Sequence, residues 1–139
     1  SLAPGAFVLV VRNIEAFESR YGAGLPVAGQ FEPDNLSNGG ENVKLSFGAG
    51  VAIREFQYLD AAPWPPAADG SGRSLVLIEP GSAPDHADPV NWRASARVGG
   101  SPGAAEPSAT PAKSETSRAV EALWVRAEII IPSVKNSDT

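Results

Sequence analysis

The sequence has no cysteine, no methionine and one histidine, and its basic residues are outnumbered by its acidic ones. Without cysteine the chain can form no disulfide, no thiolate metal site and no cysteine nucleophile. Eleven basic residues against 16 acidic ones give a net charge of -5 and a sequence pI near 4.8. A nucleic-acid binder needs positive charge spread over one face to neutralise phosphates, so the composition disfavours nucleic acid as a partner.

Long hydrophobic runs are also missing. No apolar stretch reaches the length of a membrane-spanning helix, so we expect neither a signal peptide nor a membrane span. The chain begins at Ser1 without an initiator methionine, which is typical of a mature segment or an excised fragment. A length of 139 residues suits one domain with a real core, and 14 glycines and 13 prolines favour strands and turns.

The N-terminal part predicts one strand and one helix. Ala6–Val11 is a continuous apolar, β-branched run, which indicates a buried strand. A two-turn helix is expected to follow, capped by Asn13 and ended by Gly22. Its apolar residues, at helical spacing on one face, are Ile14, Phe17 and Tyr21.

The clearest local signal is a β-hairpin, in which Val43–Phe47 and Val51–Tyr58 flank a Gly-Ala-Gly turn. In the second strand, Val51 and Ile53 lie at odd positions, whereas Phe56 and Tyr58 lie at even positions. Successive residues point to opposite faces of a strand, so a regular strand cannot bury both pairs. We therefore predict a β-bulge at Arg54-Glu55, which would correct the parity. The four residues expected to be buried are Val51, Ile53, Phe56 and Tyr58.

The middle of the chain predicts a loop and two short strands. The prolines of residues 62–66 exclude a central strand, so we expect an ordered loop held by Trp64. Ser74–Ile78 alternates as a short strand, and a weaker strand is expected from Trp92 to Val98.

The C-terminal part divides by composition into three pieces. Residues 105–118 are rich in Pro, Ala, Ser and Thr and predict a flexible linker. Residues 119–132, which include VEALWVRAEIII, have high β propensity and predict a strand. Residues 133–139 form a polar tail.

Several sequence strings in residues 1–104 carry a family resemblance. They are LAPGAFVLVV at 2–11, LSNGGENVKL at 36–45, IREFQY at 53–58, APWPPAADGSGRSLVLI at 62–78, DPVNWRAS at 88–95 and GGSPGA at 99–104. In this order and spacing they resemble the second part of the lamin-tail domain, in its bacterial secreted branch. That domain is an immunoglobulin-like module of nuclear intermediate filaments that also occurs in secreted bacterial multidomain proteins.

The resemblance implies an all-β fold, namely an immunoglobulin-like antiparallel β-sandwich, here with one short helix near the N-terminus. It also implies a non-catalytic interaction or cell-surface anchoring module in a secreted protein. The opening strands of the family pattern are absent, which would leave an open edge. Either the chain is a fragment of a larger molecule, or, as we predict, residues 119–132 return across the linker and complete the sandwich of residues 1–104.

His86 is the one candidate for acid–base chemistry, because Asp85 and Asp88 flank it. A metal site needs about three protein ligands, and no spaced partner is present. No Gly-x-Ser-x-Gly elbow accompanies the histidine, and both aspartates suit turns. We interpret the segment as a solvated polar loop and expect no enzymatic activity.

Asp60 and Asp69 bracket the Pro-rich loop and could hold Ca²⁺ together with backbone carbonyls. The regular acidic spacing of a calcium loop is lacking, so we expect neither a metal nor a cofactor. Gly48–Gly50 and Gly70–Gly72 lack the lysine and hydroxyl residue of a phosphate loop and are interpreted as turns.

Three tryptophans support an alternative function, a carbohydrate-binding module that stacks sugar rings on exposed indoles. Trp64 and Trp92 lie in the strings that carry the family resemblance, which favours a packing role for both. Trp124 lies outside them, and strand alternation would point it away from the more apolar face of its segment. The partner is accordingly expected to be a protein or a polysaccharide, with Trp124 the first candidate for ligand contact.

Overall fold

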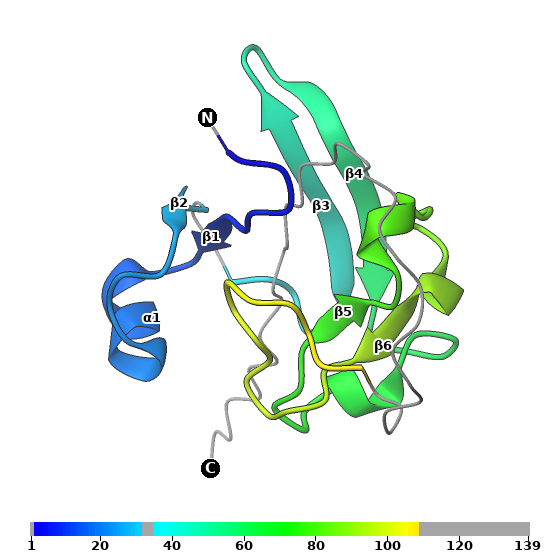
Figure 1. The fold of residues 1–139 in the computed structure, drawn as a ribbon. Coiled ribbons are helices and arrows are strands. Elements are labelled where there is room, and N and C mark those ends of the chain that lie inside the picture. The colour runs from blue at the N-terminus through cyan, green and yellow to red at the C-terminus, as the bar shows by residue number, and fades with distance from the viewer. Residues whose placement is uncertain (1, 32–34, 109–139) are drawn as a thin grey trace, which may run out of the picture.

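The computed structural model describes residues 2–31 and 35–108, which contain six strands and one α-helix (Figure 1). In chain order these are β1 (Leu9–Val11), α1 (Ile14–Tyr21), β2 (Val27–Gln30), β3 (Gly40–Phe47), β4 (Val51–Leu59), β5 (Leu75–Leu77) and β6 (Trp92–Ala94). Short 3₁₀ turns lie at Pro66–Ala68, Pro80–Ser82 and Pro89–Asn91. The expected β-rich architecture with one N-terminal helix is therefore confirmed at this coarse level.

The strands pair two by two. β3 with β4 and β5 with β6 are antiparallel, whereas β1 and β2 are parallel. The expectation of purely antiparallel pairing is thus wrong for β1 and β2. The reason is that α1 lies between these two strands and returns the chain to the same end, as a helical crossover does.

The helix α1 forms as its capping residues predict. The Asn13 side chain accepts a hydrogen bond from the Ala16 N–H at 2.8 Å, and Gly22, at φ 90°, ends the helix. Ile14, Phe17 and Tyr21 are its partly buried residues and the others are exposed. This amphipathic pattern confirms the predicted face.

β1 is shorter than predicted and alternates in burial. Leu9 and Val11 are buried, while Val10 is 37% exposed, because β1 presents only one face to the interior. Its partner β2 was not predicted, since the sequence VAGQ contains one β-branched residue and a glycine. β2 is placed by its pairing with β1, which no local pattern reveals.

The β3–β4 hairpin forms as predicted, but its bulge lies elsewhere. Lys44 pairs with Glu55 and Leu45 with Arg54 in regular register, and the shift falls before Ser46 pairs with Ala52. Ile53 is therefore the extra residue. The prediction of a bulge at Arg54-Glu55 is wrong by one or two positions.

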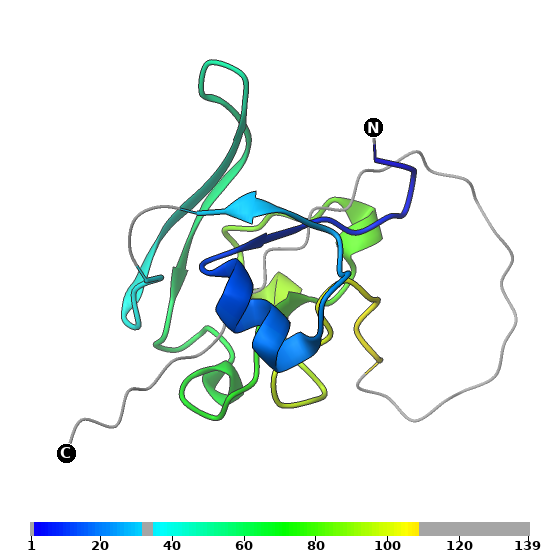
Figure 2. The same cartoon turned by 90° about the vertical axis from the view of Figure 1, so that its left-hand side faces the viewer.

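The prediction that all four apolar residues of β4 are buried is also only half right. Phe56 and Tyr58 are each 4% exposed, whereas Val51 is 70% and Ile53 52% exposed. The end of the hairpin extends beyond the other described elements, so none of the residues 2–31 and 35–108 forms a core around the first pair (Figure 2). A bulge at Arg54-Glu55 is needed only if burial continues along the whole of β4.

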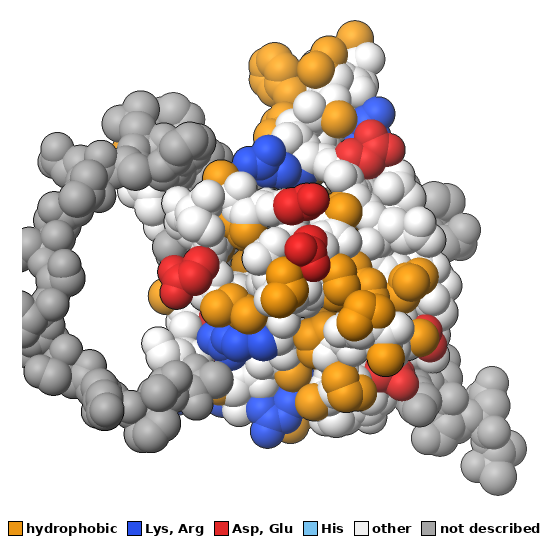
Figure 3. Space-filling model, turned by 90° about the vertical axis from the view of Figure 1, so that its right-hand side faces the viewer, with side chains coloured by type: hydrophobic (Ala, Val, Ile, Leu, Met, Phe, Trp, Pro, Cys, Tyr) orange, Lys and Arg blue, Asp and Glu red, His pale blue; other side chains and the backbone are white. Residues whose placement is uncertain are grey.

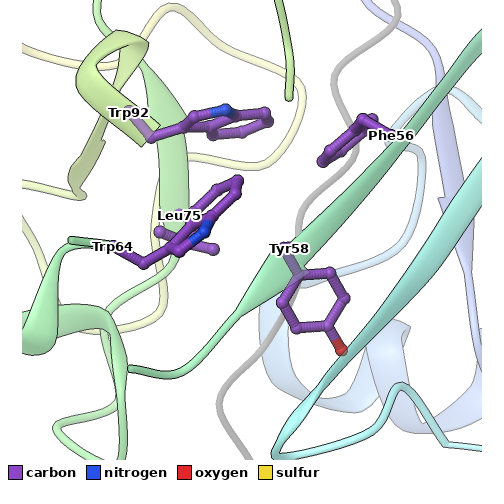
Figure 4. Close-up of a cluster of buried hydrophobic side chains, with 5 residues drawn as sticks. All are labelled: Phe56, Tyr58, Trp64, Leu75 and Trp92. Carbon is purple, nitrogen blue, oxygen red and sulfur yellow. The ribbon is translucent and has the colours of Figure 1, made fainter. Parts of the chain in front are cut away.

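The main core is a largely aromatic cluster between the two antiparallel strand pairs, β3–β4 and β5–β6. Its members are Phe56 and Tyr58 from β4, Trp64 from the following loop, Leu75 from β5 and Trp92 from β6 (Figure 4). Trp64 is 4% exposed, and burial of this indole holds the Pro-rich loop in place as predicted. β4 is thus joined to the β5–β6 pair by side-chain packing rather than by strand pairing.

β5 confirms the predicted strand, but β6 ends at Ala94 rather than continuing to Val98. The Ser95 hydroxyl accepts a hydrogen bond from the Ser74 N–H at 3.0 Å and donates one to the Arg97 carbonyl at 2.6 Å. Arg73 also donates to the carbonyls of Ser95 and Ala96, at 2.5 and 2.6 Å. These side-chain hydrogen bonds compete with the ladder and turn the chain.

The first residues of the expected linker contact the domain. Glu106 accepts a hydrogen bond from the Ala96 N–H at 2.5 Å, and Arg93 donates to the Pro107 carbonyl at 2.9 Å. The rest of that segment, the expected strand 119–132 and the tail 133–139 lie outside the described residues.

Candidate functional site

Two of the three candidate tryptophans are part of the core. Trp92 is 7% exposed, stacks on Phe56 with ring centroids 5.2 Å apart and lies 5.9 Å from the Trp64 ring. Its Nε1–H donates to the His86 carbonyl at 2.9 Å. Neither buried indole offers a face for sugar stacking. Trp124 lies outside the described residues.

His86 packs against this cluster rather than lying in a fully solvated loop. Its ring is 5.5 Å from that of Phe56 and 5.8 Å, edge on, from that of Trp92. The Nδ1 atom lies 2.8 Å from the Pro84 carbonyl oxygen, which places a proton on Nδ1. The solvated-loop interpretation is thus wrong for the imidazole, which combines apolar packing with one local hydrogen bond.

The two aspartates beside His86 shape turns, as the sequence predicts. Asp85 accepts a hydrogen bond from the Ala87 N–H at 2.9 Å, and Asp88 accepts one from the Val90 N–H at 3.1 Å at the start of the 3₁₀ turn. Both carboxylates therefore bond to the backbone two residues onward, in Asx turns. They are not arranged around the imidazole.

Asp60 and Asp69 lie at either end of the Pro-rich loop. Among residues 2–31 and 35–108, no three His, Asp or Glu side chains are grouped closely enough to hold a metal ion. The expectation about Ca²⁺ stays a prediction. Asp60 does act on Tyr58: burial first, and then the charges of Glu41 and Asp60, raise the pKa of Tyr58 to about 12.

The most unusual surface feature is the end of the β3–β4 hairpin, residues 47–53, which we call the hairpin tip. Phe47 is 76% exposed and Val51, its partner across the hairpin, is 70% exposed. Ile53, the bulged residue, adds a third exposed apolar side chain. Figure 3 shows hydrophobic side chains gathered at this projecting end of the molecule. Single exposed apolar residues are ordinary, but three neighbouring ones on a projection make the hairpin tip the candidate interaction site.

The hairpin tip has a distinct charge pattern. Residues 45–53 carry no charge, and the first charged residues on either side are basic, Lys44 on β3 and Arg54 on β4. Glu55 faces Lys44 across the hairpin and accepts a hydrogen bond from the Asn42 side-chain amide at 2.9 Å. The base of the tip therefore has one cation, Arg54, without an acidic partner directly across the ladder, where Leu45 lies instead.

Sequence reasoning missed this site because it assigned Val51 and Ile53 to the core. The signal that could have found it is the uncharged stretch itself. A hairpin turn exposed to water normally carries polar or charged residues, whereas LSFGAGVAI has one hydroxyl group as its only polar side chain.

Comparison with known protein families, with curated proteins and with solved structures finds no match for this chain. The lamin-tail resemblance therefore stays a prediction. Within the described ranges, none of the helical segments has the length and apolarity needed to cross a bilayer.

Proposed function

We propose that this chain is a non-catalytic interaction module that attaches a secreted or cell-surface protein to a partner through the hairpin tip. The observation that carries the proposal is the exposure of Phe47 and Val51, 76% and 70%, at the projecting end of an otherwise compact hairpin. Leaving such side chains in water forgoes the free energy of burying them, about 1.5–3 kcal/mol each. A bound partner that covers the tip would recover it.

The arrangement of the hairpin supports this function. In the part of the hairpin away from the tip, Phe56 and Tyr58 fix the strand register because both lie in the aromatic core. The tip therefore projects from a rigid base. Binding through a preorganised element costs little conformational entropy, which is why rigid projections make effective contact sites.

The same core supports the finer fold assignment. We propose that the β3–β4 and β5–β6 pairs belong to the two layers of an immunoglobulin-like sandwich of the lamin-tail kind. Support comes from the packing of β4 against β5 and β6 through side chains, as facing layers do, and from the family strings, which contain all five residues of the aromatic cluster.

A panel of immobilised surfaces tests the function. The full chain and the double variant Phe47→Ser/Val51→Ser would be compared on protein-coated, polysaccharide-coated and lipid-coated surfaces by biolayer interferometry. The matched control is Val90→Ser/Val98→Ser, which changes residues that are 70% and 63% exposed away from the tip.

We expect at least one surface to bind the wild-type chain and the control equally and the tip variant at least tenfold more weakly. Binding that survives in the tip variant would contradict the proposal. If the chain binds a polysaccharide-coated surface and Trp124→Ala abolishes that binding, the alternative carbohydrate-binding function is the correct one.

A further inference from the structure

We propose that the hairpin tip inserts into the headgroup region of an anionic lipid bilayer. This inference rests on the proposed function, since it names the partner of the same tip. Three features of the described residues favour a bilayer over a protein: the convex shape of the tip, its charge pattern and the distance from it of Glu41, the next acidic residue of the hairpin after Glu55.

The shape of the tip suits a fluid apolar medium. Its exposed apolar surface comes from three side chains, Phe47, Val51 and Ile53. A stable protein interface buries roughly 800 Å² on each partner, more than three side chains can supply, so a second copy of this chain meeting tip to tip would be held weakly. A bilayer needs no complementary pocket, because lipids rearrange around a small apolar wedge.

The depth of insertion follows from the turn. The backbone groups of Gly48–Gly50 leave the ladder and need water or lipid oxygens as hydrogen-bond partners, which the hydrocarbon interior does not offer. The tip therefore stops at the boundary between headgroups and acyl chains, about 5–10 Å deep, as interfacial segments do.

At that depth the basic residues meet the headgroups. Arg54 lies three positions from Val51, and Lys44 lies three positions from Phe47, or about 10 Å at roughly 3.3 Å per residue. Lipid phosphates and carboxylates can accept hydrogen bonds from both. Because Glu55 faces Lys44, most of the net attraction comes from Arg54.

Along the hairpin, the next acidic residue after Glu55 lies farther from the tip. Glu41 is six positions from Phe47 along β3, a separation of about 20 Å at roughly 3.3 Å per residue. The Debye length is about 8 Å at physiological ionic strength. Repulsion between this acidic residue and an anionic surface is therefore largely screened when only the tip is inserted.

Vesicle sedimentation tests the inference with the full 139-residue chain. Wild type, Phe47→Ser/Val51→Ser, Arg54→Gln and the control Val90→Ser/Val98→Ser would be mixed with phosphatidylcholine vesicles with and without 30% phosphatidylserine, in 20 mM and 500 mM NaCl. We expect phosphatidylserine vesicles to retain wild type and control alike, the tip variant to partition at least tenfold more weakly, and Arg54→Gln to lose several-fold only in low salt.

A fluorescent label reports insertion directly. The chain has no cysteine, so Ala49→Cys and Val90→Cys each give a single site for an environment-sensitive dye such as NBD. Dye at position 49 should shift to the blue and gain intensity on phosphatidylserine vesicles, while dye at position 90 should not change.

The outcomes separate this inference from the proposed function. No retention on vesicles, or retention that the tip variant leaves intact, would overturn bilayer insertion. A tip-dependent dimer in sedimentation velocity, or tip-dependent binding to the protein surfaces of the panel alone, would also overturn it while leaving the interaction function in place. Circular dichroism of each variant establishes that it is folded.

Discussion

Removing the Trp92 side chain should lower the free energy of unfolding more than any other single truncation in the aromatic cluster. The ring contacts Phe56, Trp64 and His86 at centroid distances of 5.2, 5.9 and 5.8 Å. Truncating a buried tryptophan to alanine costs about 3–5 kcal/mol, from lost burial and from the cavity that remains. Since whole domains are stable by about 5–15 kcal/mol, Trp92→Ala should remove between about a fifth and all of the free energy of unfolding.

Trp92→Phe separates packing from hydrogen bonding. Phenylalanine keeps an aromatic ring beside Phe56 but loses the Nε1–H that donates to the His86 carbonyl at 2.9 Å. Because that carbonyl is only partly buried, water can replace the donor in part, and we expect a loss of about 1 kcal/mol.

Urea denaturation followed by far-UV circular dichroism gives both values without relying on tryptophan fluorescence. With an m-value of about 1–3 kcal/mol per M, the alanine variant should shift the midpoint by about 1 M or more. Val90→Ala, at a residue that is 70% exposed, is the control and should change stability by less than about 0.5 kcal/mol. An equally small change in Trp92→Ala would refute the assignment of Trp92 to the core.

Three further predictions concern the backbone, pH and metals. Gly40→Ala should lose at least about 2 kcal/mol in urea denaturation, because Gly40 has φ 104° and an added Cβ would come close to the Tyr58 carbonyl oxygen. Gly39→Ala, with nothing within 4 Å and no positive φ, should change little by comparison. Because the pKa of Tyr58 is raised to about 12, its contribution to stability is fully present below pH 10 and is lost as pH rises toward 12. Absorbance at 295 nm should show this late ionisation, and Tyr58→Phe should remove it. EDTA should leave the melting temperature unchanged, whereas a drop that Ca²⁺ restores would instead assign a metal site at Asp60 or Asp69.

Short-range patterns predicted the elements whose causes are local. Asn13 and Gly22 define α1 because a cap and a positive φ act within one helical turn. The β3–β4 hairpin and β5 followed from alternation between turn residues. Trp64 was correctly assigned to hold its loop, since the neighbouring prolines leave a large aromatic ring as the only strong anchor.

The failures came where an element depends on a distant one. β2 exists through its pairing with β1, and its own residues have little β propensity. The bulge was misplaced because burial along β4 depends on how far the rest of the protein extends, which period-two alternation cannot reveal. For the same reason the exposure of Phe47 and Val51 was not predicted, because exposure is a property of the assembled protein.

The position of the bulge at Ile53 lets the two halves of the hairpin vary independently. On the core side of the bulge, pairing of Val43 with Phe56 locks the strands to the core, and the unpaired Ile53 absorbs the offset between this part and the turn. A peptide inserted between Gly48 and Gly50 would therefore lengthen the loop without changing the register below, at a cost that grows only logarithmically with its length. The hairpin could thus serve as a display scaffold, on which new recognition sequences are grafted and selected.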